Sequence, residues 1–228
     1  MKYLKNKKII MKKIIITIIS IFLLFSCSNQ ENIWENEEKP NLEKTIIALW
    51  DSLTAWYNLD INEAYPKQLE DLLKKNNYNY KIINAWVSWD TSKNLLDRMW
   101  IYDDIKADIY ILAIWWNDWL RQLSIKDMKK NIIDIIKHLQ EKNPDGEIVF
   151  AWMQMPINVW LEYSKDFKDA FFEIQKEEKL YFYEFLLEWV ARDTSLNLSD
   201  WIHPNKDWYT IIAKNLYDFL EKEDLIEK

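Results

Sequence analysis

Glycine is almost missing from this chain. A soluble domain contains about 7% glycine, which predicts roughly 16 glycines in 228 residues, yet the sequence has one glycine and 14 tryptophans. The codon UGA means tryptophan in one reassigned bacterial code and glycine in another. We therefore hypothesise that most of the tryptophans are glycines in the native protein. The alternative is a chain that is truly rich in tryptophan, and the codons at these positions distinguish the two.

Cysteine, histidine and basic residues are also scarce. Cys27 is the single cysteine, so no disulfide can form within the chain. With two histidines and one cysteine the sequence lacks the ligands of a zinc site, and we expect no metal or other cofactor. Acidic residues outnumber Lys and Arg by 37 to 30. Binding to phosphate backbones needs clustered basic residues, so we expect no nucleic-acid partner.

The first 27 residues have the pattern of an export signal. A basic start is followed by an apolar run over 14–25 and a small residue, Ser26, before Cys27. The run is shorter than the roughly 20 residues of a membrane-spanning helix. Residues 24–27, LFSC, resemble a bacterial lipobox, which implies cleavage before Cys27, its lipidation, and a membrane-anchored protein on the extracytoplasmic side. An uncleaved anchor and an ordinary secretory signal of a secreted or periplasmic protein remain alternatives.

The rest of the chain divides into a tether and one domain. Residues 28–43 are polar and acidic, and they cannot bury enough apolar surface to offset the entropy of ordering. We interpret them as a flexible linker. Residues 44–225 have the length of a single domain with a sizeable core.

Short apolar runs alternate with longer amphipathic stretches throughout this domain. Strands are predicted at 45–49, 81–87, 107–114, 147–153 and 180–185. Apolar spacings of three and four predict helices at 63–76, 92–104, 124–141, 164–178 and 206–222. Apolar strands joined by helices indicate a mostly parallel sheet covered on both faces. The predicted fold is a doubly wound, flavodoxin-like α/β/α domain with a five-stranded sheet.

Polar residues follow several of the predicted strands, where open parallel sheets bind their ligands. These residues are Asp51, Ser52, Asp90, Thr91, Asn117, Asp118, Asp200 and His203. Asp200 precedes His203 by three residues, so the carboxylate can orient the imidazole while its other nitrogen faces a serine. The second histidine, His138, falls within a predicted helix. His203 is therefore the candidate for a general base.

Four segments together resemble the sequence blocks of the SGNH hydrolases, also called the GDSL esterases and lipases. They read WDSLTAW at 50–56, NAWVSWDTS at 84–92, WWNDWLR at 115–121 and DWIHPN at 200–205. With glycine in place of tryptophan they become GDSLTAG, NAGVSGDTS, GGNDGLR and DGIHPN. These resemble the branch that contains arylesterases and the acyl-CoA thioesterase I and lysophospholipase L1 type. The resemblance implies a serine esterase without a cofactor.

The same resemblance implies a role for individual residues. Ser52 is similar to the family's nucleophile, His203 to its general base and Asp200 to the residue that orients the imidazole. The oxyanion hole would consist of the backbone N–H groups of Ser52 and Trp89 and the side-chain amide of Asn117. The family has glycine where this chain has tryptophan at positions 50, 56, 86, 89, 115, 116, 119, 152, 160, 189, 201 and 208.

Three kinds of substrate or ligand are compatible with the sequence. The resemblance favours a small-molecule acyl ester, a lysophospholipid or an acyl thioester. The alternative within the family is removal of O-acetyl groups from cell-wall or extracellular glycans, and the apolar residues Met153, Met155, Ile157 and Leu161 favour the first reading. If the tryptophans are real, a non-catalytic surface lipoprotein that binds sugars through exposed indoles is a third possibility.

Overall fold

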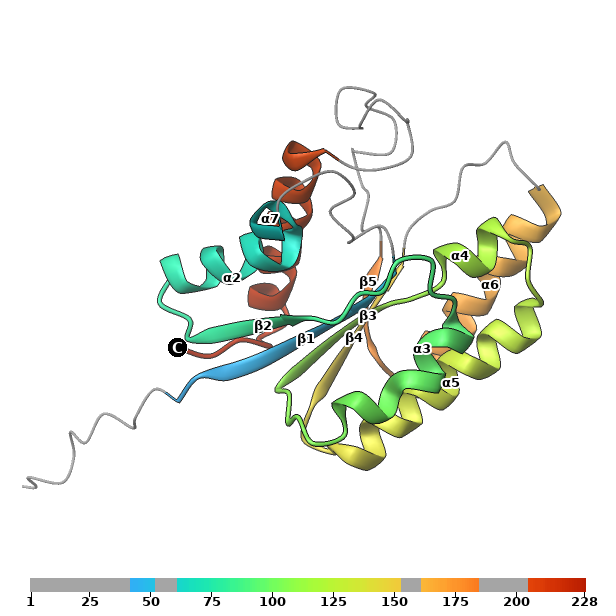
Figure 1. The fold of residues 1–228 in the computed structure, drawn as a ribbon, viewed down its shortest axis with the longest axis horizontal. Coiled ribbons are helices and arrows are strands. Elements are labelled where there is room, and N and C mark those ends of the chain that lie inside the picture. Colours follow the sequence, from blue (N-terminus) through green and yellow to red (C-terminus); the bar gives the residue numbers. More distant parts are fainter. Residues whose placement is uncertain (1–41, 52–60, 153–160, 185–204) are drawn as a thin grey trace, which may run out of the picture. The chain divides into compact units, whose positions relative to one another are not determined.

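Five parallel strands form one sheet at the centre of the domain (Figure 1). The computed structural model describes residues 42–51, 61–152, 161–184 and 205–228, all within the unit Leu42–Lys228. The strands are β1 (Lys44–Trp50), β2 (Tyr80–Asn84), β3 (Ile109–Ala113), β4 (Glu147–Trp152) and β5 (Tyr181–Glu184). They lie in the order β2-β1-β3-β4-β5, and every neighbouring pair is parallel. The predicted five-stranded sheet is confirmed.

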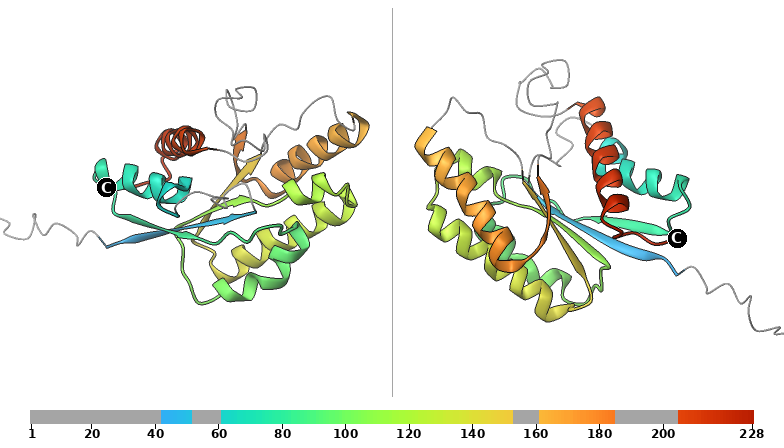
Figure 2. Two further views of the ribbon diagram at one scale, coloured as in Figure 1. Left: turned by 45° about the horizontal axis from the view of Figure 1, so that its top comes forward. Right: turned by 180° about the vertical axis from the view of Figure 1, so that it is seen from behind.

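Both faces of this sheet are covered by helices. They are α2 (Tyr65–Lys75), α3 (Ser92–Arg98), α4 (Trp116–Leu120), α5 (Ile125–Lys142), α6 (Leu161–Glu178) and α7 (Lys206–Lys222), with short 3-10 turns at η1 (Ile61–Glu63) and η2 (Met99–Tyr102). Figure 2 shows α2 and α7 on one face and α3, α5 and α6 on the other. The fold is therefore the predicted three-layer α/β/α sandwich.

The burial of the strands explains why their sequences are apolar without alternation. Every residue of β3 is buried, and so is every residue of β1 except Lys44. A strand covered on both faces needs apolar side chains in both directions. β1 and β3 therefore lie in the interior of the domain, and the loops that follow them start from buried backbone.

Three helices, α3, α5 and α7, begin where the sequence offers a capping side chain. The hydroxyl of Ser124 accepts a hydrogen bond from the amide of Asp127 at the start of α5, and the Asn205 side chain accepts one from Trp208 at the start of α7. Thr91 and Asn94 form a reciprocal capping box at α3. Such caps satisfy amides that have no partner inside the helix. Among the described residues, no helix combines the length and the apolar character needed to cross a membrane.

Two predicted elements end earlier than expected. The helix expected over 92–104 is split, because the backbone leaves the helical region at Arg98 (φ −110°, ψ 6°) and continues as the 3-10 turn η2. The strand expected over 81–87 ends at Asn84, after which only the amide of Ala85 still donates to the carbonyl of Ala48. The short helix α4 was not predicted, since five residues are too few for a periodic pattern.

Arg98, the last residue of α3, fastens the loop between β2 and α3. Its Nε donates to Asp90 Oδ2 at 2.7 Å, its Nη2 donates to the carbonyl of Ala85 at 2.9 Å, and its Nη1 donates to the Tyr102 hydroxyl. Both partners of the ion pair are largely buried. The guanidinium thus ties the end of β2 to the first turn of the next helix.

We expect Arg98→Ala to lower the free energy of unfolding by about 3 kcal/mol, because it leaves the carboxylate of Asp90 buried without its partner. Lys93→Ala on the same helix removes an exposed ion pair with Asp97 and should cost less than about 1 kcal/mol. Urea denaturation of both variants measures the difference. Equal losses would contradict a special role for the Arg98 contact.

Candidate active site

The carboxyl ends of β1, β2 and β3 bring three segments of the sequence together. Asp51 follows β1, residues 85–91 follow β2, and Trp115 to Asn117 follow β3. Because β1 lies between β2 and β3, the loops of the two outer strands flank the end of the central one. Ser52, Asp200 and His203 lie outside the described residues, as does Cys27. Their predicted roles stay predictions.

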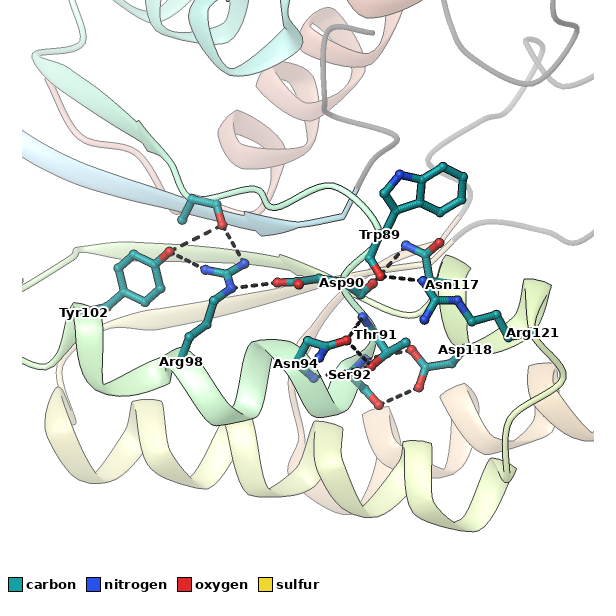
Figure 3. Close-up of polar contacts among 11 residues, drawn as sticks. Trp89, Asp90, Thr91, Ser92, Asn94, Arg98, Tyr102, Asn117, Asp118 and Arg121 are labelled. Atoms are coloured by element: carbon teal, nitrogen blue, oxygen red, sulfur yellow. Dashed lines mark hydrogen bonds and ion pairs between the residues drawn. The ribbon is translucent and has the colours of Figure 1, made fainter.

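Asn117 is a buried polar side chain at this edge of the sheet. Its side chain is fully buried, and its Nδ2 donates one hydrogen bond to the carbonyl of Asp90 at 2.9 Å (Figure 3). Within the described part of the chain, its Oδ1 has no hydrogen-bond partner. A buried amide oxygen without a partner is uncommon in proteins, and each side-chain amide nitrogen carries two N–H donors. The hydrogen of Nδ2 that does not bond to Asp90 is the one that the predicted role would donate to an oxyanion.

Residue 89, the second predicted donor, lies on the opposite loop. Trp89 has φ +67°, in the left-handed region where glycine is favoured. Its indole is 59% exposed, so packing of the side chain does not offset this strained backbone. The carbonyl of Trp89 accepts a hydrogen bond from Arg121 Nη2 at 2.9 Å. The backbone at this position therefore has the conformation that the family resemblance assigned to a glycine.

The residue before Ser52 connects the first loop to the third. Asp51 is buried, and its Oδ2 accepts a hydrogen bond from the amide of Trp116 at 3.1 Å. This bond joins the end of β1 to the first residue of α4. The strand that precedes the predicted nucleophile is thereby held beside Asn117.

Asp90 and Thr91, which the sequence placed among the candidate site residues, have structural contacts instead. The Asp90 carboxylate binds Arg98, and the Thr91 side chain caps α3. Their contribution to the site is the Asp90 carbonyl, which accepts from Asn117. His138, the histidine set aside, contacts Asp103 in the structure, with Nε2 2.6 Å from Oδ1.

A buried carboxylate lies directly behind Asn117. Asp118 is almost completely buried, and its two oxygens accept hydrogen bonds from the amide and the hydroxyl of Ser92. Burial raises the pKa of Asp118, while the bonds from Ser92 and the charge of Arg121 oppose that shift. Sequence reasoning noted Asp118 but missed Ser92 and Arg121, because contacts between residues about 30 positions apart produce no local pattern.

Several indoles crowd the same edge of the sheet. Trp115 and Trp116 lie in edge contact with ring centroids 6.2 Å apart, and Trp116 and Trp119 are 5.0 Å apart. Trp50, at the end of β1, contacts Tyr65. Of the residues expected to form an apolar acyl site, Leu161 is exposed, and Met153, Met155 and Ile157 lie outside the described residues. In the described ranges, no group of three or more His, Cys, Asp or Glu could hold a metal ion.

Comparison with known proteins is consistent with this geometry. The pattern of the GDSL-like Lipase/Acylhydrolase family matches residues 48–211. An arylesterase of Vibrio mimicus is 26% identical over 170 residues, covering 74% of this chain and 84% of the relative. The Escherichia coli (strain K12) protein "Thioesterase 1/protease 1/lysophospholipase L1" is 25% identical over 170 residues, covering 74% and 79%.

A solved structure extends the likeness to the whole fold. The psychrotrophic esterase EstA from Pseudoalteromonas sp., in a structure inhibited by monoethylphosphonate, superposes with a TM-score of 0.74 and 27% identity. The match covers 79% of this chain and 98% of that one. The chain belongs to the GDSL-like lipase/acylhydrolase family, and it has the fold and the ester-hydrolase class of the SGNH enzymes.

Proposed function

We propose that this protein hydrolyses small acyl esters, lysophospholipids or acyl thioesters through an acyl-enzyme intermediate, with Ser52 as the nucleophile. The observation that supports this most strongly is the position of Asn117, whose side-chain amide is buried beside the end of the strand that leads to Ser52. A side-chain amide at this place stabilises negative charge on a substrate carbonyl oxygen.

The chemistry follows from the residues assigned to the site. The imidazole of His203 removes the proton from the Ser52 hydroxyl, which attacks the acyl carbon, and Asp200 holds the imidazole in the required tautomer. The developing oxyanion accepts hydrogen bonds from the backbone amides of residues 52 and 89 and from Asn117 Nδ2. When the tetrahedral intermediate collapses, the imidazolium of His203 gives its proton to the leaving alcohol or thiol, and the acyl group stays on Ser52. Water, activated by the same imidazole, then attacks the acyl-enzyme and releases the acid.

Ser52→Ala and His203→Ala should each lower kcat on p-nitrophenyl butyrate by about 10³-fold or more, because the members of a triad act as a unit. Ser124→Ala, which removes an exposed helix cap, is the matched control and should retain full turnover. A monoethylphosphonate reagent should label the parent protein at Ser52 and leave Ser52→Ala unlabelled. Unchanged turnover in either triad variant would rule out this assignment.

The choice of substrate can be tested with the same protein. The names of the relatives, arylesterase and lysophospholipase L1, favour acyl esters of aryl alcohols or lysophospholipids over O-acetylated glycans. Release of fatty acid from lysophosphatidylcholine, without release of acetate from acetylated xylan, would support the first class. The reverse result would favour the glycan O-acetylesterase.

We also propose that the protein is exported and held at the membrane by a lipid on Cys27. The support is the export pattern of the first 27 residues, in which the single cysteine follows the apolar run. Two acyl chains or an equivalent pair of signals give stable membrane association, whereas one chain alone is reversible. The polar segment 28–43 would then connect the lipid to the catalytic domain.

Metabolic labelling with a fatty acid should mark the wild-type protein and not Cys27→Ser, because the modified thiol is removed. The Cys27→Ser protein should also move from the membrane fraction to the soluble exported fraction. Labelling of both proteins to the same extent would exclude the lipoprotein assignment.

A third proposal concerns the tryptophans, which we infer are glycines in the native protein at the twelve positions of the family blocks and also at 34 and 100. The family's own designation begins with glycine where this chain has Trp50 before Asp51, Ser52 and Leu53. Trp89 has a left-handed backbone. Within the described residues, the indole N–H groups of Trp50 and Trp208 are buried without a hydrogen-bond partner, although buried tryptophans usually have one.

Gly146, the one glycine of the sequence, lies where there is no room for a side chain. A Cβ at Gly146 would lie 2.5 Å from Asn143 Nδ2 and 2.8 Å from both the carbonyl of Ala107 and a ring carbon of Tyr110. No side chain fits there without displacing its neighbours. Gly146 is thus a position where glycine is required, and we expect an ordinary glycine codon.

Peptides of the protein isolated from its own host should show the mass of glycine at these tryptophan positions, and the codons should be UGA. In a recombinant chain with glycine throughout, tryptophan at position 89 alone should lower stability by about 1–3 kcal/mol because of its positive φ. Tryptophan at position 100, which is 70% exposed, is the control and should change stability by less than about 1 kcal/mol. Tryptophan masses in the native peptides would overturn the proposal and revive the Trp-rich sugar-binding protein.

A further inference from the structure

The two predicted oxyanion donors outside the nucleophile lie on loops that no strand pairing joins. The amide of residue 89 follows β2, and Asn117 follows β3, with β1 between them. Strands two positions apart in a sheet are about 10 Å apart. The separation of the two donors therefore depends on side-chain contacts that cross the end of β1.

The strongest of these contacts joins Asp118 and Ser92. Asp118 Oδ2 accepts from the Ser92 amide and Oδ1 accepts from the Ser92 hydroxyl, both at 2.7 Å (Figure 3). Both residues are buried. Hydrogen bonds to a carboxylate are shorter and stronger than those between neutral groups, and two of them fix direction as well as distance.

The direction of the serine hydroxyl is set by a third residue. Asn131 Nδ2, from α5, donates to Ser92 Oγ at 3.1 Å. Because the oxygen accepts from Asn131, the hydroxyl hydrogen is available for Asp118. The pair is thereby attached to the helical layer beneath the site, which has a buried apolar face.

The position of the pair in the sequence connects it to the donors. Asp118 directly follows Asn117, and Ser92 is three residues from position 89. Two further bonds cross the same gap, from Asn117 Nδ2 to the Asp90 carbonyl and from Arg121 to the Trp89 carbonyl. Arg121 is on the surface, so water competes for its bond, whereas the bonds between Asp118 and Ser92 are shielded.

We propose that Asp118 is a positioning residue, which acts through Ser92 to hold the amide of residue 89 and Asn117 Nδ2 at the separation that an oxyanion requires. The inference rests on the proposed ester hydrolysis and adds residues outside the triad and the oxyanion hole. Preorganised donors act only when they are in place, and a shift of about 1 Å can cost on the order of 10²-fold in rate.

The test uses the full chain as translated in its own host. Asp118→Ala and Ser92→Ala should each lower kcat on p-nitrophenyl butyrate by about 10- to 100-fold, with KM changed by less than about twofold, because an oxyanion donor acts in the transition state. The double variant should be no slower than the slower single variant. Asn117→Ala gives the loss when a donor itself is absent, about 10²- to 10³-fold.

Two further variants separate positioning from stability. Asp118→Asn keeps an oxygen for the Ser92 amide but reverses the second bond, with its N–H₂ donating to the Ser92 oxygen, so it should restore part of the rate lost in Asp118→Ala. Asn143→Ala removes a buried hydrogen bond to the carbonyl of Ala107, ahead of β3, at the opposite edge of the sheet. It should lower the melting temperature while leaving kcat unchanged.

The side-chain amide signal of Asn117 in ¹⁵N-labelled protein provides a readout that does not need turnover. It should shift in Asp118→Ala, return toward its original position in Asp118→Asn, and remain unchanged in Asn143→Ala. If the parent protein hydrolysed no ester, the proposed function would fail and this signal would still decide the role of Asp118. An unchanged Asn117 signal, or an unchanged kcat in Asp118→Ala despite a lower melting temperature, would overturn the inference.

Discussion

The position of β1 between β2 and β3 is the constraint on which the site depends. The strand that leads to the predicted nucleophile has parallel partners on both sides, so main-chain hydrogen bonds hold it along both edges. The loops after its two neighbours are then forced to the same edge. Sheet topology thus selects which segments meet, and the polar contacts beyond the strand ends determine how they meet.

The polar contacts beyond the strand ends require several polar side chains to be buried, at positions where apolar side chains would stabilise the fold more. Asp51, Asn117, Asp118 and Ser92 are buried, and a buried polar group without a partner costs about 1–3 kcal/mol. Most of them have partners, which limits the cost. Of these four, Asn117 has one polar atom, Oδ1, without a partner among the described residues. An unsatisfied group at the carboxyl edge of a parallel sheet is the kind of local disadvantage that proteins retain at binding sites.

The sequence predicted the sheet well because β1, β3 and β4 are buried on both faces, and strands buried in this way appear in the sequence as short runs of apolar residues. It also located Asn117 and the unusual residue at 89, since their neighbours form recognisable blocks. The sequence did not predict three hydrogen-bonded contacts, those of Arg98 with Asp90, of Ser92 with Asp118 and of Arg121 with Trp89. These contacts depend on the conformations of loops at the edge of the sheet, and loop conformation produces no periodic pattern in the sequence. Ser52, Asp200 and His203 are still known only as sequence predictions.

The indoles at this edge bear on how the site is to be interpreted. Trp116 contacts the rings of both Trp115 and Trp119 beside Asn117, but Trp115 and Trp119 are buried, so these two indoles offer no exposed face to a sugar or an aryl group. The proposed oxyanion donor Asn117 must reach the acyl carbonyl, and bulky side chains on its own loop would obstruct that approach. With glycine at these positions, the backbone of the loop could approach the substrate closely. The proposed ester hydrolysis and the proposed glycines therefore depend on each other. Asn117 can act as an oxyanion donor only if the indoles of its own loop are absent.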